Sequence, residues 1–349
     1  MRLEESLRRT VRDMPQKAAL VSDGTRLTYR EFDELSDGLA SALRRRGVVP
    51  GDRVIVQMET IWEAAVAILG VLKAGAVFCP VNPAIRDQAL GAIIRDTGAR
   101  IALTQGKFAD RYAQHVLLVV AARPAPRMPA NVEMFEDCTA AHGGAAAERL
   151  SEKDLAMILH TSGSTGEAKG VAMSHQSMDF VADAIARYLE HTAEDVVLCA
   201  LPLTFNYGLY QLLVAVRTGA TLVCQKSFAF PVDVLKTARA EGVTGLPLVP
   251  TMAAQLIALR ELGDDPLPAL RYLTNAAAAL PPVHVERLLA LFPRARLFSM
   301  YGLTECGRAT YLAPAELPAR SGSVGKALPG TRALVVDVSG APAQAGETG

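Results

Sequence analysis

The strongest constraint on the fold is a regular alternation of strand-like and helix-like segments in the second half of the chain. Short apolar runs typical of buried strands occupy 196–201, 220–225, 243–249, 271–275 and 296–299. Helix-like segments follow the first four of these runs, at 208–218, 231–241, 250–262 and 281–291. Parallel strands need such crossovers, and the crossover helices cover the faces of the sheet. The alternation therefore predicts an α/β protein with largely parallel sheets.

The first 120 residues show a less regular version of the same alternation. Helices are expected at 3–13, 29–46, 61–74 and 84–97, and strands at 26–29, 54–58, 76–80, 100–104 and 116–120. Residues 121–150 are rich in alanine, proline, arginine and glycine, so we predict a linker or loosely packed connection there. Residues 332–338 alternate like a strand, which is predicted to belong to a small β-barrel.

Composition and charge exclude several classes of protein. The chain has 349 residues and a formal net charge of +0, so no nucleic acid or anionic membrane is expected as a partner. The longest apolar region, 61–81, contains Glu63 and Lys73 and is interrupted by glycines, which predicts a buried helix and strand and no membrane span. Five scattered cysteines, and an N-terminus without the apolar block of a signal peptide, indicate a cytoplasmic protein with reduced thiols.

A glycine-rich stretch, TSGSTGEAKG, runs from Thr161 to Gly170 between an apolar run at 155–159 and a helix-like segment at 174–189. Glycines let the backbone approach phosphate oxygens, hydroxyl and N–H groups donate hydrogen bonds, and Lys169 adds positive charge. The spacing is not that of the common nucleotide-binding loop, in which Lys-Ser or Lys-Thr follows the second glycine directly. The stretch predicts a phosphate-binding loop of another class, and the alternative is a surface turn rich in small residues.

A second polar stretch, Tyr301-Gly302-Leu303-Thr304-Glu305, follows the last predicted strand. A carboxylate beside a hydroxyl suits Mg²⁺, which accepts one carboxylate together with substrate oxygens and water. The ring of Tyr301 offers a flat face for a purine base. The alternative is a helix N-terminus capped by Thr304. Because ligands bind beyond the carboxyl ends of parallel strands, we expect three loops to converge on one crevice with the glycine-rich stretch: 202–208, 275–280 and 300–308.

Five stretches resemble, in order and spacing, those of the adenylate-forming (AMP-binding) enzymes, which include acyl-CoA synthetases, aryl-acid ligases and peptide-synthetase adenylation domains. They are LTYREF at 27–32, LKAGAVFCPVN at 72–82, the stretch at 161–170, YGLTE at 301–305 and SVGK at 323–326. The resemblance covers nearly the whole chain, and its two site motifs together are highly specific. It implies the family's large N-terminal core: two mostly parallel β-sheets flanked by helices in layers, plus a small distorted β-barrel near the C-terminus.

The resemblance implies a site for ATP and Mg²⁺. The residues that match the family's ATP-binding positions are Thr161, Ser162, Gly163, Ser164, Thr165, Gly166, Lys169, Ala276, Ala277, Ala278, Ser299, Met300, Tyr301, Gly302, Leu303 and Thr304. In the family the glycine-rich loop holds the β- and γ-phosphates, the small residues border the adenine, and the aromatic ring packs on it. The implied catalytic residues are Lys169, Thr304 at the α-phosphate, and Glu305, which is also the implied Mg²⁺ ligand. The family usually has proline where this chain has Ala168, a change expected to loosen the loop slightly.

The implied reaction is attack of a substrate carboxylate on the α-phosphorus of ATP, giving an acyl-adenylate and pyrophosphate. The acyl group then passes to the thiol of coenzyme A or of a phosphopantetheinyl carrier protein. The implied substrate-binding residues are Phe205, Asn206, Tyr207, Gly208 and Arg308. Amino-acid-activating members often carry aspartate where this chain has Asn206, so a plain carboxylic acid is favoured over an α-amino acid. Core packing of the two aromatic side chains and a solvated Arg308 are the alternatives, and a second carboxylate on the substrate would also suit the arginine.

The resemblance ends before the family's hinge and its small C-terminal domain, whose lysine reaches the α-phosphate. We therefore expect an N-terminal adenylation core at 1–349, with subdomains at about 1–150, 151–320 and 321–349 and without the C-terminal lid. Such a core is expected to bind ATP and acid weakly and to adenylate slowly or not at all. Two other functions stay open: a module that binds nucleotide or acyl-adenylate without catalysis, and an amino-acid-activating domain.

Overall fold

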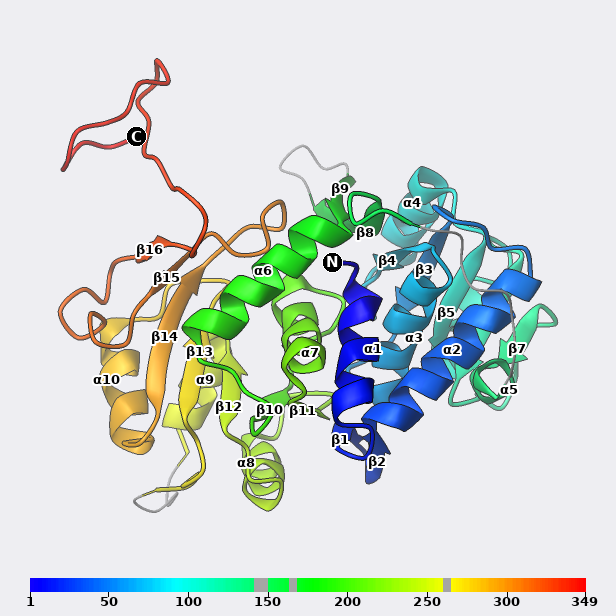
Figure 1. Cartoon of the computed structure of the whole chain (residues 1–349), viewed down its shortest axis with the longest axis horizontal. Helices are drawn as coiled ribbons and strands as arrows, with labels where there is room; N and C mark the ends of the chain where they lie inside the picture. Colours follow the sequence, from blue (N-terminus) through cyan, green and yellow to red (C-terminus); the bar gives the residue numbers. More distant parts are fainter. Residues whose placement is uncertain (141–149, 163–167, 260–264) are drawn as a thin grey trace.

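The computed structural model of the chain describes residues 1–140, 150–162, 168–259 and 265–349. Within these residues the strands form two sheets, of nine and of seven strands, with helices packed on their faces (Figure 1). Most neighbouring strands run parallel, and antiparallel strands occur at the edges. The predicted α/β architecture with two mostly parallel sheets is confirmed, and each sheet takes strands from both sides of residue 150.

The nine-stranded sheet has the order β16-β15-β14-β13-β12-β10-β11-β1-β2. Its parallel centre confirms the strands predicted in the second half of the chain: β10 (Val196–Cys199), β11 (Thr221–Cys224), β12 (Gly245–Leu248), β13 (Tyr272–Asn275) and β14 (Arg296–Tyr301). The strand β1 (Ala18–Ser22), which was not among the predicted strands, lies parallel to β11. Antiparallel strands complete the edges: β2 (Thr25–Thr28), β15 (Thr310–Leu312) and β16 (Lys326–Ala327).

The seven-stranded sheet has the order β7-β6-β5-β3-β4-β8-β9. Four of its strands confirm the sequence prediction to within about two residues: β3 (Arg53–Gln57), β4 (Val77–Pro80), β5 (Ile101–Gln105) and β6 (Leu118–Ala122). Their side chains are buried on both faces of the sheet, as expected for parallel strands covered by helices.

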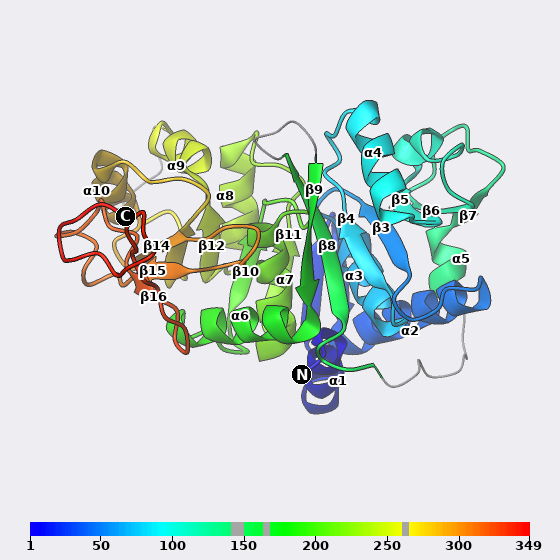
Figure 2. The ribbon, with the colours of Figure 1, turned by 90° about the horizontal axis from the view of Figure 1, so that it is seen from above.

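The largest hydrophobic core joins the two sheets. Its helices are α1 (Leu3–Asp13), α2 (Tyr29–Arg45), α3 (Trp62–Lys73), α6 (His175–Tyr188) and α7 (Asn206–Thr218). A second core packs α8 (Pro231–Ala240), α9 (Pro250–Ile257) and α10 (Pro282–Leu291) on the nine-stranded sheet. A third core packs α4 (Asp87–Thr97) and the short 3-10 helix η1 (Gly106–Arg111) on the seven-stranded sheet (Figure 2). The helices of the largest core therefore connect the two sheets.

Local sequence signals set several helix ends. The hydroxyl oxygen of Thr28 accepts a hydrogen bond from the N–H of Glu31, and the Glu31 carboxylate accepts one from the N–H of Thr28 at 2.7 Å. This capping box starts α2 at the residue where the sequence predicts a helix. Gly98, with φ of 61°, ends α4 in the left-handed conformation that glycine adopts without a steric cost.

The predicted strand–loop–helix arrangement around the glycine-rich stretch is wrong. The strand β8 (Leu155–Ser162) is followed by a second strand, β9 (Ala168–Ser174), which pairs antiparallel with it along its whole length. The helix α6 begins only at His175, with the Ser174 hydroxyl accepting a hydrogen bond from the N–H of Ser177. The glycine-rich stretch therefore connects two strands of a hairpin and is not a helix N-terminus.

The predicted linker at 121–150 is also wrong for the residues that the structure describes. Residues 121 and 122 end β6, and the chain then forms β7 (Val132–Met134) and the short helix α5 (Phe135–Thr139). Phe135 is fully buried, and its ring meets that of Trp62 edge-on, with 6.3 Å between the ring centroids. Phe135 and Cys138, both buried, anchor a segment whose composition resembles a linker. Residues 141–149 lie outside the described part.

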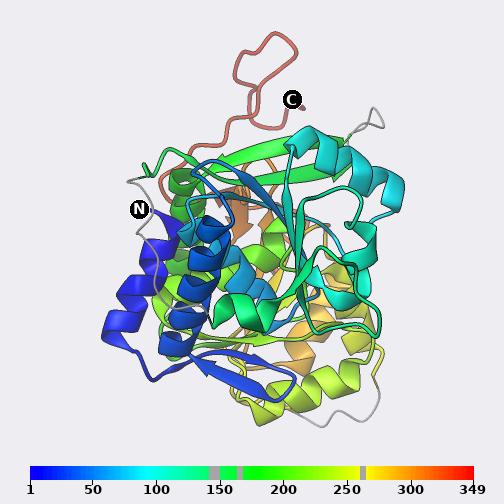
Figure 3. The same ribbon diagram turned by 90° about the vertical axis from the view of Figure 1, so that its right-hand side faces the viewer.

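The strand predicted at 332–338, and with it the predicted β-barrel, is not formed by the described residues. Only an isolated bridge joins Val336 to Pro342 in this region. Leu334 and Val338 are exposed, and the segment stands away from both sheets (Figure 3). The alternating pattern lacks a partner strand here, and an alternating strand is stable only when one of its faces is covered.

Candidate active site

Side-chain contacts bring together two of the three loops that were expected to converge, 202–208 and 300–308, and join the first of them to β13. The Asn206 side-chain amide donates a hydrogen bond to the backbone carbonyl oxygen of Thr304 at 2.9 Å. The hydroxyls of Tyr207 and Thr274 lie 2.7 Å apart. The guanidinium of Arg308 lies over the ring of Tyr207, 5.1 Å from its centroid. These contacts link the segments that follow β10 and β14 to Thr274 near the end of β13, at the carboxyl ends of parallel strands of one sheet.

The stretch from Tyr301 to Glu305 is a tight loop. The strand β14 continues to Tyr301, and the residues after it form turns, so the predicted alternative of a helix N-terminus is wrong. A Cβ added at Gly302 would lie 2.7 Å from the carbonyl oxygen of Gly307, so the two ends of the loop approach each other closely. Tyr301 and Glu305 are exposed and Thr304 is half-buried. The side chains with predicted roles at the base and at Mg²⁺ are therefore presented to solvent.

The neighbouring loop, after β13, holds a strained residue. Ala277 has φ of 75°, which is uncommon for a residue with a Cβ. The Asn275 side-chain amide donates to the carbonyl oxygen of Ala278 at 3.0 Å and so holds the loop closed. Ala276 is buried, whereas Ala277 and Ala278 are exposed. Strained backbone of this kind clusters at binding sites, and it lies here at the predicted adenine-binding position.

The glycine-rich stretch is described only at its two ends. Thr161 on β8 faces Lys169 on β9 across the hairpin ladder, and Lys169 is exposed. Gly163, Ser164, Thr165 and Gly166 lie outside the described residues, and only the backbone of Ser162 is described, as part of β8. The described contacts join the loops of the nine-stranded sheet, and none of them joins Lys169 to Glu305.

The predicted acid-binding residues lie at the start of α7. Phe205 is exposed, so the alternative that it packs in the core is wrong, whereas Tyr207 is half-buried and packs against the largest core. Gly208 is buried, and a Cβ there would lie 2.2 Å from the carbonyl oxygen of Pro202. Only glycine lets the helix start so close to the preceding loop. This contact fixes where Asn206 and Tyr207 project.

Arg308 is buried, with only 5% of its surface exposed, so the alternative of a solvated arginine is wrong. Its guanidinium lies over the Tyr207 ring, and the Tyr210 hydroxyl packs against the preceding residue, Gly307. Its charge also acts on the Tyr188 hydroxyl. Burial raises the pKa of each tyrosine, that of Tyr188 to about 12, and the positive charge of Arg308 opposes the rise. Tyr188 and Tyr210 were not among the predicted site residues. Their sequence pattern could not reveal them, because a buried tyrosine on a helix is more often a core residue.

Several polar atoms of the segments that carry the predicted site are buried without a hydrogen-bond partner in the described structure. They are Thr204 Oγ1, Asn206 Oδ1, Tyr210 OH, Asn275 Oδ1 and Arg308 Nε. Leaving a buried polar group unpaired costs roughly 1–3 kcal/mol, and native folds hold few of them. Two of these atoms lie on α7, one at the end of β13 and two on the loops after β10 and β14, so all five belong to the elements that carry the predicted site.

Glu305 fits the predicted role at Mg²⁺ as a single carboxylate. Among the described residues, no group of three or more His, Cys, Asp or Glu side chains could hold a metal ion by itself. Mg²⁺ in nucleotide sites is held by one or two carboxylates together with substrate phosphates and water. An exposed Glu305 beside Thr304 is compatible with such a site, in which the substrate and water supply the other metal ligands.

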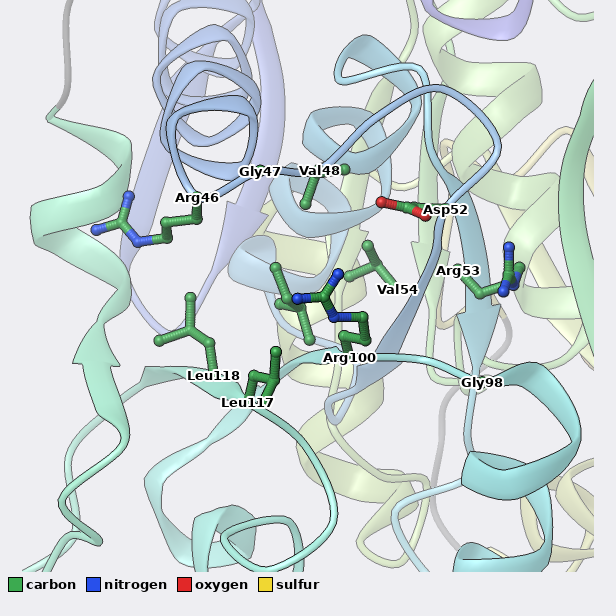
Figure 4. Close-up of a pocket in the computed structure, with 11 residues that line it drawn as sticks. Arg46, Gly47, Val48, Asp52, Arg53, Val54, Gly98, Arg100, Leu117 and Leu118 are labelled. Atoms are coloured by element: carbon green, nitrogen blue, oxygen red, sulfur yellow. The ribbon is translucent and has the colours of Figure 1, made fainter.

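A separate pocket opens elsewhere, at the amino ends of β3 and β5 (Figure 4). Arg46, Arg53 and Arg100 border it together with Leu117, and none of the predicted site residues lines it. Arg46 is paired with Glu133, and Arg53 donates to the carbonyl oxygen of Thr97 at 2.7 Å. The pocket lies at the opposite strand ends from those that carry ligands in folds of this kind.

No helix among the described residues has the length and apolar character needed to cross a lipid bilayer. All five cysteines are free thiols, and four of them are buried.

Comparison with known proteins finds relatives among CoA ligases and synthases. A propanoyl:CoA ligase of Mycobacterium tuberculosis, whose acyl group carries a methyl-dioxo-octahydroindene ring system, is 32% identical over 315 residues, which cover 86% of this chain and 61% of the relative. One component of the linear gramicidin synthase of Brevibacillus parabrevis is 29% identical over 96% of this chain and 6% of its own length. The chain thus spans less than two thirds of these curated relatives.

Among solved structures, VinN superposes with a TM-score of 0.87 and 32% identity, over 99% of this chain and 86% of VinN. VinN has also been solved with L-aspartate and with 3-methylaspartate. The sequence family described as AMP-binding enzyme matches residues 7–349. The fold, the converging loops and these matches agree, and the chain belongs to the AMP-binding family of adenylate-forming enzymes.

Proposed function

We propose that the chain is the ATP- and acid-binding part of an AMP-forming carboxylic acid ligase that transfers the acyl group to a thiol. The observation that carries the proposal is the contact between Asn206 and Thr304, because it joins the predicted acid pocket to the predicted nucleotide loop. The relatives support the ligase class, since they include a CoA ligase and a component of a peptide synthetase.

The chemistry requires an in-line attack. One oxygen of the substrate carboxylate forms a bond to the α-phosphorus of ATP, and the bond from that phosphorus to the bridging oxygen of the β-phosphate breaks. The electron pair leaves with pyrophosphate, and the acyl-adenylate remains. Since both partners are anions, the protein's main tasks are to offset their repulsion and to hold them in line.

The residues present suit these tasks. We assign Lys169 and the glycine-rich stretch to the β- and γ-phosphates, and the exposed ring of Tyr301 to the adenine base beside the strained Ala277. Thr304 is assigned to the α-phosphate. We assign Glu305 as the carboxylate that holds Mg²⁺, which would supply positive charge to the phosphates. The tight loop from Gly302 to Gly307 would keep the side chains of Thr304 and Glu305 close to the predicted acid-binding residues.

The acceptor is a thiol, and relatives of both kinds are known, one a CoA ligase and one a multi-domain synthetase. We propose coenzyme A or a phosphopantetheinyl carrier arm as the acceptor, in a cytoplasmic protein. The five free thiols are consistent with that reducing compartment.

A second candidate is an amino-acid-activating domain, because VinN has been solved with L-aspartate and 3-methylaspartate. The chain itself argues against it at one position. Asn206 is neutral, and its amide is already bonded to the Thr304 carbonyl, so it offers no negative charge to a substrate ammonium. We therefore favour an acid without an ammonium group.

ATP–pyrophosphate exchange with a panel of carboxylic acids, followed by hydroxamate capture, tests the proposal. It should be run on the 349-residue chain and on a form extended to the length of the relatives. We expect acid-dependent exchange by the extended form and slow or no exchange by the shorter chain, which nevertheless binds ATP with Mg²⁺. Binding of ATP without exchange by either form, for every acid, would favour a binding module and overturn the ligase.

A further inference from the structure

We infer that the acid activated at this site carries a second carboxylate, which Arg308 binds inside a cage formed by Tyr188, Tyr207 and Tyr210. The inference rests on the proposed function and extends it to a substrate class, the dicarboxylic acids. Arg308 is then the residue that determines specificity.

The first observation is that Arg308 is a buried cation without an acidic partner. Only 5% of its surface is exposed, and its Nε atom has no hydrogen-bond partner among the described residues. No carboxylate of the described residues forms an ion pair with it. An isolated buried charge is strongly unfavourable unless it is paired.

Two other arginines that reach into the fold pair with carboxylates, whereas the half-buried Arg44 donates to the carbonyl oxygen of Lys73 at 2.9 Å. Arg123 binds Glu63, with 2.7 Å between Nε and the nearer carboxylate oxygen. Arg271 binds the buried Asp195 with two of its nitrogens, at 2.9 and 2.7 Å. Each of these guanidinium groups is half-buried and has a carboxylate beside it. Arg308 is more deeply buried than Arg123 or Arg271 and has no carboxylate of the described residues beside it. It lies where a substrate is expected.

The second observation is the composition of the cage. The Tyr207 ring lies beneath the guanidinium, and its hydroxyl is already bonded to Thr274. The Tyr188 hydroxyl contacts the Met300 sulfur at 2.8 Å. The Tyr210 hydroxyl is buried and has no partner in the described structure. Arg308 and Tyr210 therefore each carry a buried donor without a partner, and the Tyr210 hydroxyl packs against Gly307, the residue before Arg308. A carboxylate can accept hydrogen bonds from donors of both kinds.

The third observation places the cage beside the reacting centre. Arg308 belongs to the same loop as Thr304 and Glu305, and it packs on Tyr207, which follows Asn206 in α7. Since Asn206 holds the Thr304 carbonyl, the cage is connected through Tyr207 and Asn206 to the loop of the predicted α-phosphate residue. A dicarboxylate could place one carboxylate at the cage and the other at the α-phosphorus.

The charge of the cage also defines what it rejects. A substrate ammonium near Arg308 would be repelled, and Asn206 cannot offset that repulsion. An acid with an uncharged end would leave the guanidinium buried and unpaired. The expected rejection of an ammonium group and of an uncharged end predicts that the charge at the far end of the acyl chain, as well as the chain's length, decides which acid is accepted.

The test uses acyl-sulfamoyl adenosines, stable mimics of acyl-adenylates, bound to the 349-residue chain and followed by calorimetry. The acyl groups run from malonyl to adipoyl, each compared with its ω-amide, which has the same shape and no charge. We expect one carboxylate of the series to bind at least about tenfold more tightly than its amide. Equal affinity of every matched pair would overturn the inference while leaving the proposed function standing.

Arg308→Gln and Arg308→Lys provide the second comparison. Arg308→Gln should abolish the preference for the carboxylate and change affinity for the amide by less than about threefold, and Arg308→Lys should restore part of the preference. Loss of binding for both members of a pair would indicate a structural role and contradict the inference. Should no mimic bind the unaltered chain, the proposed function itself would fail. The comparison of matched pairs on the unaltered chain needs no variant and holds even if Arg308→Gln does not fold.

Discussion

The side-chain amide of Asn206, at the start of α7, donates a hydrogen bond to the main-chain carbonyl oxygen of Thr304 at 2.9 Å. The bond joins two loops that are far apart in the sequence and that carry different predicted tasks, acid binding and nucleotide binding. The Asn206 Oδ1 atom remains buried and unpaired in the described structure, so the side chain can still donate to one loop while accepting from a ligand.

Replacing Asn206 by aspartate should destabilise the protein and should not create an amino-acid site. The carboxylate would face the Thr304 carbonyl without a donor between them, at an expected cost of about 1–3 kcal/mol. Chemical denaturation with and without ATP and Mg²⁺ measures the change. Asn206→Ala is the matched control, expected to lose only about 1 kcal/mol. Tight binding of α-amino acids by the aspartate variant would contradict the prediction.

Replacing Glu305 by glutamine should weaken binding of ATP in the presence of Mg²⁺ by about tenfold or more and leave the fold intact. Glu305 is exposed, so its loss removes a ligand and no packing. Calorimetric titration with ATP, in the presence and in the absence of Mg²⁺, separates the metal-dependent part of the affinity. Glu286→Gln, an exposed carboxylate on α10, is the control and should change neither affinity. An unaltered affinity in the Glu305 variant would remove this residue from the metal site.

Replacing Gly208 by alanine should distort the acid pocket, because the new Cβ would lie 2.2 Å from the carbonyl oxygen of Pro202. Backbone atoms cannot give way as a flexible side chain can, and the expected loss of stability is about 1–3 kcal/mol or more. Gly322→Ala is a suitable control, since a Cβ there meets nothing within 4 Å. Equal melting temperatures of the two variants would show that the segment after β10 can move away from the helix.

Stability should fall on acidification because of His191. Burial lowers the pKa of His191 to about 4, even though Asp195 raises it, while the unfolded chain has the ordinary value of about 6.5. Below about pH 6.5 His191 binds a proton in the unfolded state but stays neutral in the folded state. The stability is therefore fully present above about pH 6.5 and is lost progressively as the pH falls towards 4.

His191→Gln should reduce the acid-side slope of unfolding free energy against pH by up to about 1.4 kcal/mol per pH unit. Glutamine can keep a hydrogen bond to Thr218, whose hydroxyl lies 2.9 Å from Nδ1 of His191. Urea unfolding at several pH values between about 4 and 7 measures the slope. The exposed His115, changed to glutamine, provides the reference, and equal slopes in both variants would contradict the assignment.

Much of the fold could be predicted because it is coded locally. The strands of the parallel centres are short apolar runs separated by amphipathic helices, and Thr28 and Gly98 mark helix ends with their own side-chain and backbone chemistry. The errors concern segments whose structure depends on distant partners. The strand β9 exists because β8 lies beside it, and α5 is held in place by the burial of Phe135.

The site divides in the same way. The glycine-rich stretch and the residues from Tyr301 to Glu305 are contiguous motifs, so their place in the chain could be predicted, although their roles remain predictions. The environment of Arg308 could not be predicted from the sequence. Tyr188 belongs to α6 and Tyr210 to α7, and only the packed fold brings their rings to the loop after β14. Whether an arginine is solvated depends on such distant neighbours.

The position of β1 has a consequence for synthesis of the protein on the ribosome. The Thr221 hydroxyl on β11 donates to the carbonyl oxygen of Ala18 at 2.8 Å, although the two residues are 203 positions apart. At about 5–20 residues per second, the first strand emerges roughly 10–40 seconds before its partner exists. Until then the backbone donors and acceptors of β1 that later face β11 can pair with other chains, so we expect nascent polypeptides that end before β11 to need chaperones.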